Sequence, residues 1–292
     1  MVSVPVAQTT QAKPSSVRVA WQPIVWFGAL LILCYAPILY RLGVQWATDE
    51  DMGYGFLVPI VAGFIAWQRR GILAATPRQP NAWGLVLVVF AALEALAATL
   101  GAELFTARLA FIVALFGVIL YLGGKRWVKE LLFPLLLMLF MIPIPAIIYA
   151  QLTLKLQMLA AALGETLIGW MGIPVLRSGN TLQLPSQTLD VAVACSGIRS
   201  LLSLGFLSLV YAYFTDKRIW MRWVLLGATI PIAICANGIR VAVTGLMSEV
   251  NPKLAQGAYH EMEGYIVFIV ALVALVIVHR LINFAIKKAK KA

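Results

Sequence analysis

The sequence predicts an all-α integral membrane protein of about eight transmembrane helices, with a small β element and an interfacial helix between the fifth and sixth of them. Hydrophobic residues make up 62% of the 292-residue chain and charged residues only 12%, which excludes an ordinary soluble globule. The apolar residues also gather into runs that approach the roughly 20 helical residues needed to cross about 30 Å of hydrocarbon.

Eight apolar runs are the predicted transmembrane helices, and the second, which contains Pro59, is the shortest. They cover residues 21–40, 54–68, 83–100, 104–122, 131–148, 197–214, 221–245 and 264–284. Together they form one membrane domain, 21–286, between a polar segment, 1–20, and a basic tail, 287–292. The first run is full length and lacks an obvious cleavage site, which indicates an uncleaved signal-anchor.

The distribution of positive charge predicts the orientation of these helices. With a cytoplasmic N-terminus, sixteen of the 23 Lys and Arg residues fall on the cytoplasmic side together with two acids. The opposite side carries seven basic and nine acidic residues, and Glu94 lies within the third helix. Because basic loops are retained in the cytoplasm, we expect both termini on the cytoplasmic side of the membrane. The net charge of +11 then reflects topology, and no nucleic-acid partner is expected.

The longest segment between predicted helices is 149–194, on the outer side. Its first part, LTLKLQMLAAALGETLIGWMG, has few charges and is typical of an amphipathic helix lying in the interface. Its second part, IPVLRSGNTLQLPSQTLDVAVA, contains short alternating runs separated by the turn sequences SGN and PS. These signals predict a small β element that leads directly to Cys195.

Helix geometry places three polar residues from different helices at one depth. At about 1.5 Å per residue, Arg240 lies roughly 27 Å from the basic residue that marks the cytoplasmic end of its helix. The same measure gives roughly 33 Å for Cys195 and roughly 30 Å for His260. A thiol, a guanidinium and an imidazole are therefore expected in one layer, at the outer interface of the membrane.

Cys195 differs from the other two cysteines of the chain. Cys34 and Cys235 lie inside apolar runs and are expected to act as small hydrophobic residues. Cys195 precedes the first turn of a helix, where unpaired N–H groups and the positive end of the helix dipole stabilise a thiolate. This position indicates a reactive thiol.

Arg240 and His260 each have a polar neighbour that favours a functional role. Asn237 lies three residues before Arg240 on the same helical face, although an arginine at this depth equally fits snorkelling to lipid headgroups. Glu261 follows His260, and acidic neighbours raise the proton affinity of an imidazole for acid/base work. An ordinary surface histidine is the alternative for His260.

Other chemistries find less support in the residue inventory. The segment HEMEG lacks the second histidine of a zincin helix, so no metal site is expected, and no dinucleotide or phosphate motif predicts a cofactor. Glu94 is the main hint of a transporter's path, or else a bundle-stabilising acid. Arg177 ranks behind Arg240, and His279 is predicted at the cytoplasmic interface.

Three ordered motifs within residues 172–268 resemble the exosortase/archaeosortase family of membrane enzymes. The cysteine motif lies in GIPVLRSGNTLQLPSQTLDVAVACSGIRSLLSL, the asparagine/arginine motif in IPIAICANGIRVAVTG, and the histidine motif in AYHEMEGYIVF. The segment DMGYGFLVP is similar to a further family segment, with Tyr54 where the family pattern has histidine.

The resemblance implies a thiol protease or transpeptidase that recognises the C-terminal sorting tail of exported proteins. It assigns the nucleophile to Cys195, a supporting cation to Arg240 and the acid/base to His260. Supporting or substrate-binding positions in the same motifs are Ser196, Gly197, Arg199, Asn237 and Glu261.

The partners that the resemblance implies are exported proteins whose tail has a short motif of the PEP-CTERM kind, a hydrophobic span and a basic cluster. Membrane lipids are further partners, and the implied location is a bacterial inner membrane, with the site facing the periplasm. The implied activity extends to transfer onto a surface acceptor and a link to exopolysaccharide production. Two alternatives remain open. The same bundle fits a non-catalytic transporter or polysaccharide-export component, and it fits a scaffold that binds tails without cutting them.

Overall fold

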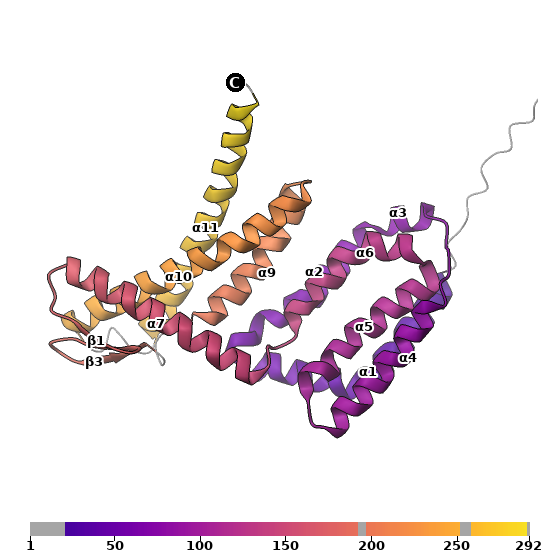
Figure 1. Ribbon diagram of the computed structural model, residues 1–292, viewed down its shortest axis with the longest axis horizontal. Coiled ribbons are helices and arrows are strands. Elements are labelled where there is room, and N and C mark those ends of the chain that lie inside the picture. The colour runs from indigo at the N-terminus through magenta and orange to yellow at the C-terminus, as the bar shows by residue number, and fades with distance from the viewer. Residues whose placement is uncertain (1–20, 192–196, 252–257, 291–292) are drawn as a thin grey trace, which may run out of the picture.

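The computed structural model describes residues 21–191, 197–251 and 258–290, and it is almost entirely helical (Figure 1). Its elements, in chain order, are α1 (Trp21–Thr48), η1 (Glu50–Phe56), α2 (Leu57–Gln68), α3 (Arg70–Ala75), α4 (Trp83–Leu100), α5 (Leu104–Gly123), α6 (Lys125–Leu137), η2 (Met138–Met141), α7 (Ala146–Trp170), β1 (Leu176–Ser178), β2 (Thr181–Gln183), β3 (Thr188–Asp190), α9 (Ile198–Thr215), α10 (Ile219–Val250) and α11 (Ala258–Ala289).

In the described part of the chain, seven helices are long and apolar enough to cross a membrane, namely α1, α4, α5, α7, α9, α10 and α11. The predicted all-α membrane fold with a small β element is confirmed. The set of long helices differs from the expected eight at three places. Segments 54–68 and 131–148 are not among them, whereas α7, expected as an interfacial helix, is.

Helix length and proline explain these differences. Segment 54–68 is divided between η1 and α2, and the 12 residues of α2 extend only about 18 Å. Segment 131–148 is interrupted because Pro143 and Pro145, which lack an N–H donor, lie between η2 and α7. Hydropathy alone does not separate a short or broken apolar helix from one that crosses the membrane.

The helices form two groups that lie side by side (Figure 1). The first group contains α1, α2, α4, α5 and α6, and its core includes Leu42, Val58, Ile65 and Ala110. Phe206 of α9 belongs to the same core and joins the first group to the second. The second group contains α7, α9, α10 and α11. Many large apolar side chains on both groups face outward, as expected for helices surrounded by lipid.

Small residues allow α7 and α10 to pack closely. A Cβ atom at Gly238 of α10 would lie 2.6 Å from the Cβ of Leu163, and one at Gly164 of α7 would lie 2.6 Å from Cγ1 of Val241. Membrane helices associate through such small residues because lipid provides no hydrophobic drive to bring them together. This contact holds the segment of α10 around Arg240 firmly against α7.

The three short strands form an antiparallel sheet in the order β1-β2-β3. Leu182 of β2 lies opposite Leu189 of β3, and both are buried in a cluster that includes residues of α7 and α10. The backbone N–H of Val191 donates to the carbonyl of Asn180 at 3.1 Å, and Val191 is fully buried. The sheet thus ties the chain that precedes Cys195 to the α7–α10 pair.

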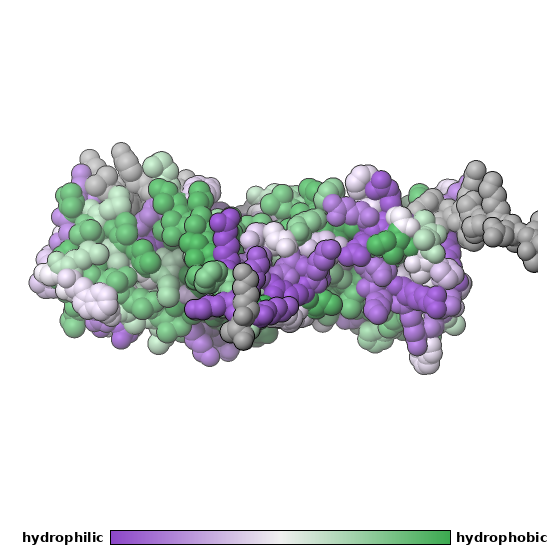
Figure 2. Space-filling model, turned by 90° about the horizontal axis from the view of Figure 1, so that it is seen from above, coloured by the Kyte–Doolittle hydropathy of each residue, from purple (hydrophilic) through white to green (hydrophobic). Residues whose placement is uncertain are grey.

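Hydrophilic residues gather at one end of the molecule. Figure 2 looks onto the end at which α2 and α9 end and α11 finishes, and the hydrophilic colour dominates its centre and right side. Exposed basic side chains at this end include Arg70, Lys125, Arg126 and Lys217. Their grouping agrees with the charge asymmetry found in the sequence.

A buried polar cluster lies at the same end, between α9, α10 and α11. His279 is buried, and its Nδ1 lies 2.9 Å from the hydroxyl of Tyr211, while its Nε2 lies 3.2 Å from Oδ2 of Asp216. Hydrogen bonds from Arg218 hold the pKa of Asp216 well below its usual range. His279 therefore lies at the expected end of its helix, but its side chain is buried inside the bundle and is not exposed at the membrane interface.

Candidate active site

The start of α9 is built around Gly197, two residues after Cys195. Gly197 has a φ of 68°, in the left-handed region, which glycine adopts without steric cost. A Cβ atom at this position would lie 2.8 Å from Nδ2 of Asn237 on α10. Glycine is therefore required twice here, once by the backbone turn and once by the close approach of a buried asparagine.

Arg240 follows Asn237 by one turn of α10 and reaches toward α11. A Cβ atom at Gly264 of α11 would lie 3.2 Å from Nη2 of Arg240 and 3.3 Å from its Cζ, so the guanidinium lies against the bare backbone of that glycine. Gly264 is one helical turn after His260. The arginine and histidine motifs thus meet at the α10–α11 contact.

A small cavity of about 10 Å³, room for about one water molecule, lies where α9, α10 and α11 come together. Its lining residues include Ser200 and Leu204 of α9, Asn237 and Arg240 of α10, and Gly264 and Phe268 of α11. Asn237 and Arg240 supply polar groups in a surface that is otherwise largely apolar. The three helices that carry the sequence motifs therefore share one cavity.

Glu263 is a polar residue of this region that the sequence analysis did not single out. It is buried, and its Oε2 accepts a hydrogen bond of 2.7 Å from the hydroxyl of Thr244, which is fully buried on α10. A buried acid inside a membrane bundle is a recognisable signal, because its cost demands a polar partner. The pair ties α10 to α11 one turn after Arg240 on α10 and directly beside Gly264 on α11.

Arg199 forms ion pairs with the N-terminal half of the chain. Its Nε lies 2.8 Å from Oδ1 of Asp51 and its Nη2 lies 3.0 Å from Oε2 of Glu50, both in η1. Asp51 also accepts a hydrogen bond from the hydroxyl of Tyr149 on α7. These contacts occupy the guanidinium that sequence analysis grouped with the supporting or substrate-binding residues. They also bring the DMGYGFLVP segment to the start of α9.

Tyr54 occupies the position at which the family pattern has histidine. Its ring packs near Phe206 of α9, with 6.2 Å between the ring centroids, as part of the core of the first helix group. In this chain the position therefore contributes an aromatic packing contact.

Four of the expected site residues lie wholly or partly outside the described residues. Cys195 and Ser196 fall in the gap between 191 and 197, and only the backbone is described for His260 and Glu261, in the first turn of α11. Among the described side chains, no group of three or more His, Cys, Asp and Glu residues is arranged to hold a metal ion.

Fold and site together define a polytopic helical membrane protein in which three helices meet at one small cavity that contains Asn237 and Arg240 of α10. A family model described as Transmembrane exosortase (Exosortase_EpsH) matches residues 46–277, which is most of the chain. The chain belongs to the transmembrane exosortase family. No curated protein and no solved structure matches it. Family membership suggests a membrane transpeptidase or protease.

Exchanging Gly197 for alanine is expected to destabilise the protein. The new Cβ would collide with Asn237 while the backbone stays in a conformation that costs other residues about 1–3 kcal/mol. The measurement is the thermal unfolding midpoint of the purified protein in detergent, which should fall. Gly227→Ala is the matched control, because a Cβ at that helical glycine meets nothing within 4 Å. Equal midpoints for the two variants would contradict the close packing at Gly197.

Proposed function

We propose that this protein is a membrane-embedded cysteine peptidase or transpeptidase that cleaves the C-terminal sorting tails of exported proteins. The observation that carries the proposal is the contact of the three motif-bearing helices α9, α10 and α11 around Asn237 and Arg240. Gly197, two residues after Cys195, packs on Asn237, and the Arg240 guanidinium lies against Gly264, which follows His260 by four residues in the sequence. Membership of the transmembrane exosortase family supports a thiol enzyme of this kind.

The proposed reaction begins with attack of the Cys195 thiolate on a peptide carbonyl. The short separation of Cys195 from the N-terminus of α9 favours the thiolate, because unpaired N–H groups and the helix dipole stabilise negative charge there. The attack forms a C–S bond and moves an electron pair onto the carbonyl oxygen. Arg240 stabilises that oxyanion, since a positioned cation acts where charge develops in the transition state.

The tetrahedral intermediate then collapses by breaking the C–N bond. His260 donates a proton to the departing nitrogen, so that the tail leaves with a neutral amine at its new N-terminus and the rest of the substrate remains as a thioester on Cys195. Water or an acceptor amine attacks the thioester, and its proton returns to His260 as the thiolate leaves. Hydrolysis and transfer to a surface acceptor thus use the same groups.

The expected substrate explains why the site lies inside a membrane protein. A tail made of a short motif, a hydrophobic span and a basic cluster, as in PEP-CTERM proteins, inserts in the same bilayer and presents its motif at a defined depth. The charge asymmetry supports cytoplasmic termini and a cavity that faces the periplasm of a bacterial cell. An association with exopolysaccharide production belongs to the same proposal.

A transporter or polysaccharide-export component is the second candidate function. Oε2 of Glu94 on α4 is buried and has no hydrogen-bond partner among the described residues. A solitary acid of this kind within a membrane helix is typical of a proton or substrate path. Glu94 does not line the cavity between α9, α10 and α11, so this candidate leaves the three motifs without a role. A scaffold that binds tails without cutting them leaves the thiol without a role.

The proposal is tested by trapping a substrate tail on Cys195. Membranes that contain the protein are incubated with an exported protein of the same host that ends in such a tail, and the reaction is stopped with acid. Mass spectrometry should find the N-terminal fragment attached to Cys195, and prior alkylation of the thiol should prevent both attachment and cleavage. Cleavage that proceeds after complete alkylation of Cys195 would show that the thiol is not the nucleophile.

A further inference from the structure

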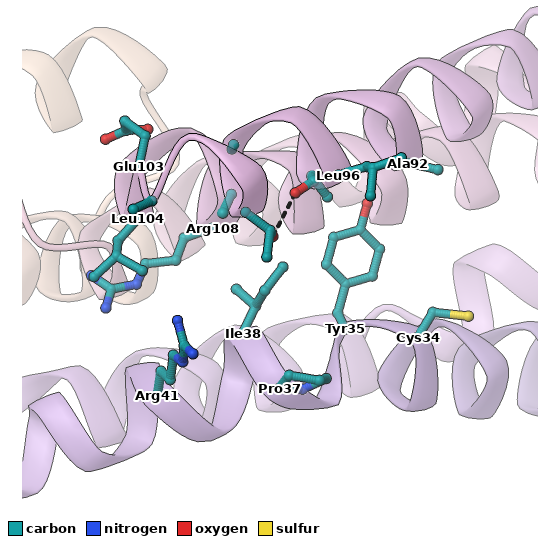
Figure 3. Close-up of a pocket in the computed structure, with 15 residues that line it drawn as sticks. Cys34, Tyr35, Pro37, Ile38, Arg41, Ala92, Leu96, Glu103, Leu104 and Arg108 are labelled. Carbon is teal, nitrogen blue, oxygen red and sulfur yellow. Dashed lines mark hydrogen bonds between the residues drawn. The ribbon is translucent and has the colours of Figure 1, made fainter.

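A second cavity lies in the N-terminal half of the molecule, between α1, α4 and α5 (Figure 3). Its volume is about 330 Å³, large enough to hold part of a ligand. It shares no lining residue with the cavity between α9, α10 and α11, so it is not an extension of the candidate active site. Most of its wall is apolar, with Ile38, Ala92, Ala95 and Leu96 among the lining residues.

Two arginines supply positive charge to this apolar cavity. Arg108 comes from α5 and Arg41 from the facing helix α1, and in Figure 3 both guanidinium groups reach the same end of the cavity. Arg108 is only 4% exposed, and its Nε has no hydrogen-bond partner among the described residues. A buried guanidinium is costly unless it is paired, so this position calls for an anionic partner.

Glu103 also lines the cavity, but its carboxylate caps the N-terminus of α5. Its Oε1 accepts a hydrogen bond of 3.0 Å from the backbone N–H of Phe105, and its Oε2 accepts one of 2.6 Å from that of Thr106. The Thr106 hydroxyl donates to the same Oε2. Glu103 thus caps the helix. Its carboxylate also attracts the Arg108 guanidinium electrostatically, at longer range. Two guanidinium groups against one capping carboxylate leave the cavity positive.

The cavity opens sideways onto the apolar surface of the bundle. Leu96 and Leu104 line it and are 58% and 43% exposed, and Cys34 and Pro37 on the opposite wall are exposed as well. Arg108 lies four residues after the start of α5 and Arg41 seven residues before the end of α1, which is about 6–10 Å from those helix ends. That is the depth at which headgroups meet acyl chains.

We propose that this cavity binds an anionic phospholipid, with the lipid phosphate held by Arg41 and Arg108 and one acyl chain lying along the apolar wall. Arginine matches phosphate because its planar donors form paired, charge-assisted hydrogen bonds. Snorkelling alone accounts for an exposed arginine such as Arg41. It does not account for Arg108, because this side chain is enclosed by protein. A lipid headgroup reaches Arg108 only by entering the cavity.

The test compares lipid binding by the purified full-length protein and its variants in native mass spectrometry. The probes are phosphatidylglycerol and phosphatidylcholine with identical acyl chains. Both carry the phosphate, but the trimethylammonium group of phosphatidylcholine adds a further positive charge near Arg41 and Arg108, whereas phosphatidylglycerol keeps a net negative charge. The wild type should retain phosphatidylglycerol preferentially, and Arg108→Gln should lower the affinity for it by about tenfold to a hundredfold. Arg41→Gln should have a similar effect, and because Arg41 is exposed this variant remains informative if Arg108→Gln does not fold.

Arg70→Gln provides the matched control. Arg70 is also an exposed arginine at a helix end, but its guanidinium stacks on the ring of Trp67, 3.8 Å from the centroid, away from the cavity. Loss of phosphatidylglycerol binding in Arg70→Gln to the same extent would show that general surface charge, not the cavity, selects the lipid. Equal retention of the two lipids by the wild type would also overturn the proposal. Competition by millimolar inorganic phosphate as effective as that by the lipid would establish a simple anion site instead.

Discussion

Exchange of Cys195 for alanine is expected to abolish tail cleavage while leaving membrane insertion unchanged. The variant retains the volume of a small apolar side chain but has no nucleophile, and removal of a catalytic nucleophile lowers turnover by about 10⁴-fold or more. The measurement is the fraction of a tail-bearing exported protein that is processed in cells, with the membrane-bound amount of each enzyme variant determined in parallel.

The chain provides two matched controls for this exchange. Cys34 and Cys235 are free, exposed cysteines on α1 and α10, and neither lines the cavity between α9, α10 and α11. Cys34→Ala and Cys235→Ala should therefore process the substrate at the wild-type rate. Normal processing by Cys195→Ala at normal abundance would contradict the enzymatic proposal and favour a transporter or a scaffold.

Exchange of Arg240 for glutamine is expected to lower kcat by about 10²- to 10³-fold, the cost of losing one group that stabilises an oxyanion. The KM for the tail should change less, because the developing charge exists only in the transition state. Arg240→Lys should recover only part of the activity. The planar guanidinium lies flat against Gly264, and an ammonium on a flexible stem does not reproduce that geometry.

Arg177→Gln is the control for Arg240→Gln. Arg177 also lies near the expected outer end, on β1, but its Nε pairs with Oε2 of Glu165 at 2.9 Å, and it is absent from the lining of the cavity. Its loss should leave kcat within about twofold, since an exposed ion pair contributes little. A kcat for Arg240→Gln equal to that for Arg177→Gln would remove Arg240 from the mechanism and leave it a bundle-stabilising role.

Much of the fold follows from local sequence patterns. The run 83–100 coincides with α4, and the predicted start of the sixth helix at 197 differs by one residue from that of α9. Gly179 and Asn180 of the turn sequence SGN lie between β1 and β2, and the turn sequence PS lies between β2 and β3. These features could be predicted because hydropathy and turn chemistry act over a few neighbouring residues.

The differences arise where the outcome depends on distant parts of the chain. Residues 54–68 and 131–148 were predicted to span the membrane because they are apolar. In the structure they form short or broken helices, and many of their residues pack in the core of the first helix group. His279 was expected at an interface because it stands beside Arg280 at the inner end of the last helix. Its partners, Tyr211 and Asp216, are more than sixty residues away in the sequence. No local pattern reveals such pairings, which depend on how three helices come together.

In the candidate site, too, part of the arrangement could be predicted from local sequence, and part depends on residues that are distant in the sequence. Helix geometry predicted that Cys195, Arg240 and His260 lie at one depth. Among the described residues of these motifs, Gly197 contacts Asn237 and Arg240 contacts Gly264. Glu263 was not predicted, because Glu261 is the immediate neighbour of His260 in the sequence. On a helix, the residue three positions away lies closer to the same face. The assignment of chemical roles to Cys195, Arg240 and His260 remains a prediction.

The ion pairs of Arg199 have a consequence for how family members can be recombined. Arg199 is in the first turn of α9, and its partners Glu50 and Asp51 are 149 and 148 residues away. Its side chain is half exposed, but Asp51 is only 22% exposed and also holds Tyr149 at the start of α7. The N-terminal half therefore helps to set the position of the helix that follows Cys195. A chimera that replaces residues 1–145 with those of another exosortase would need to bring an equivalent pair of acids for that arginine.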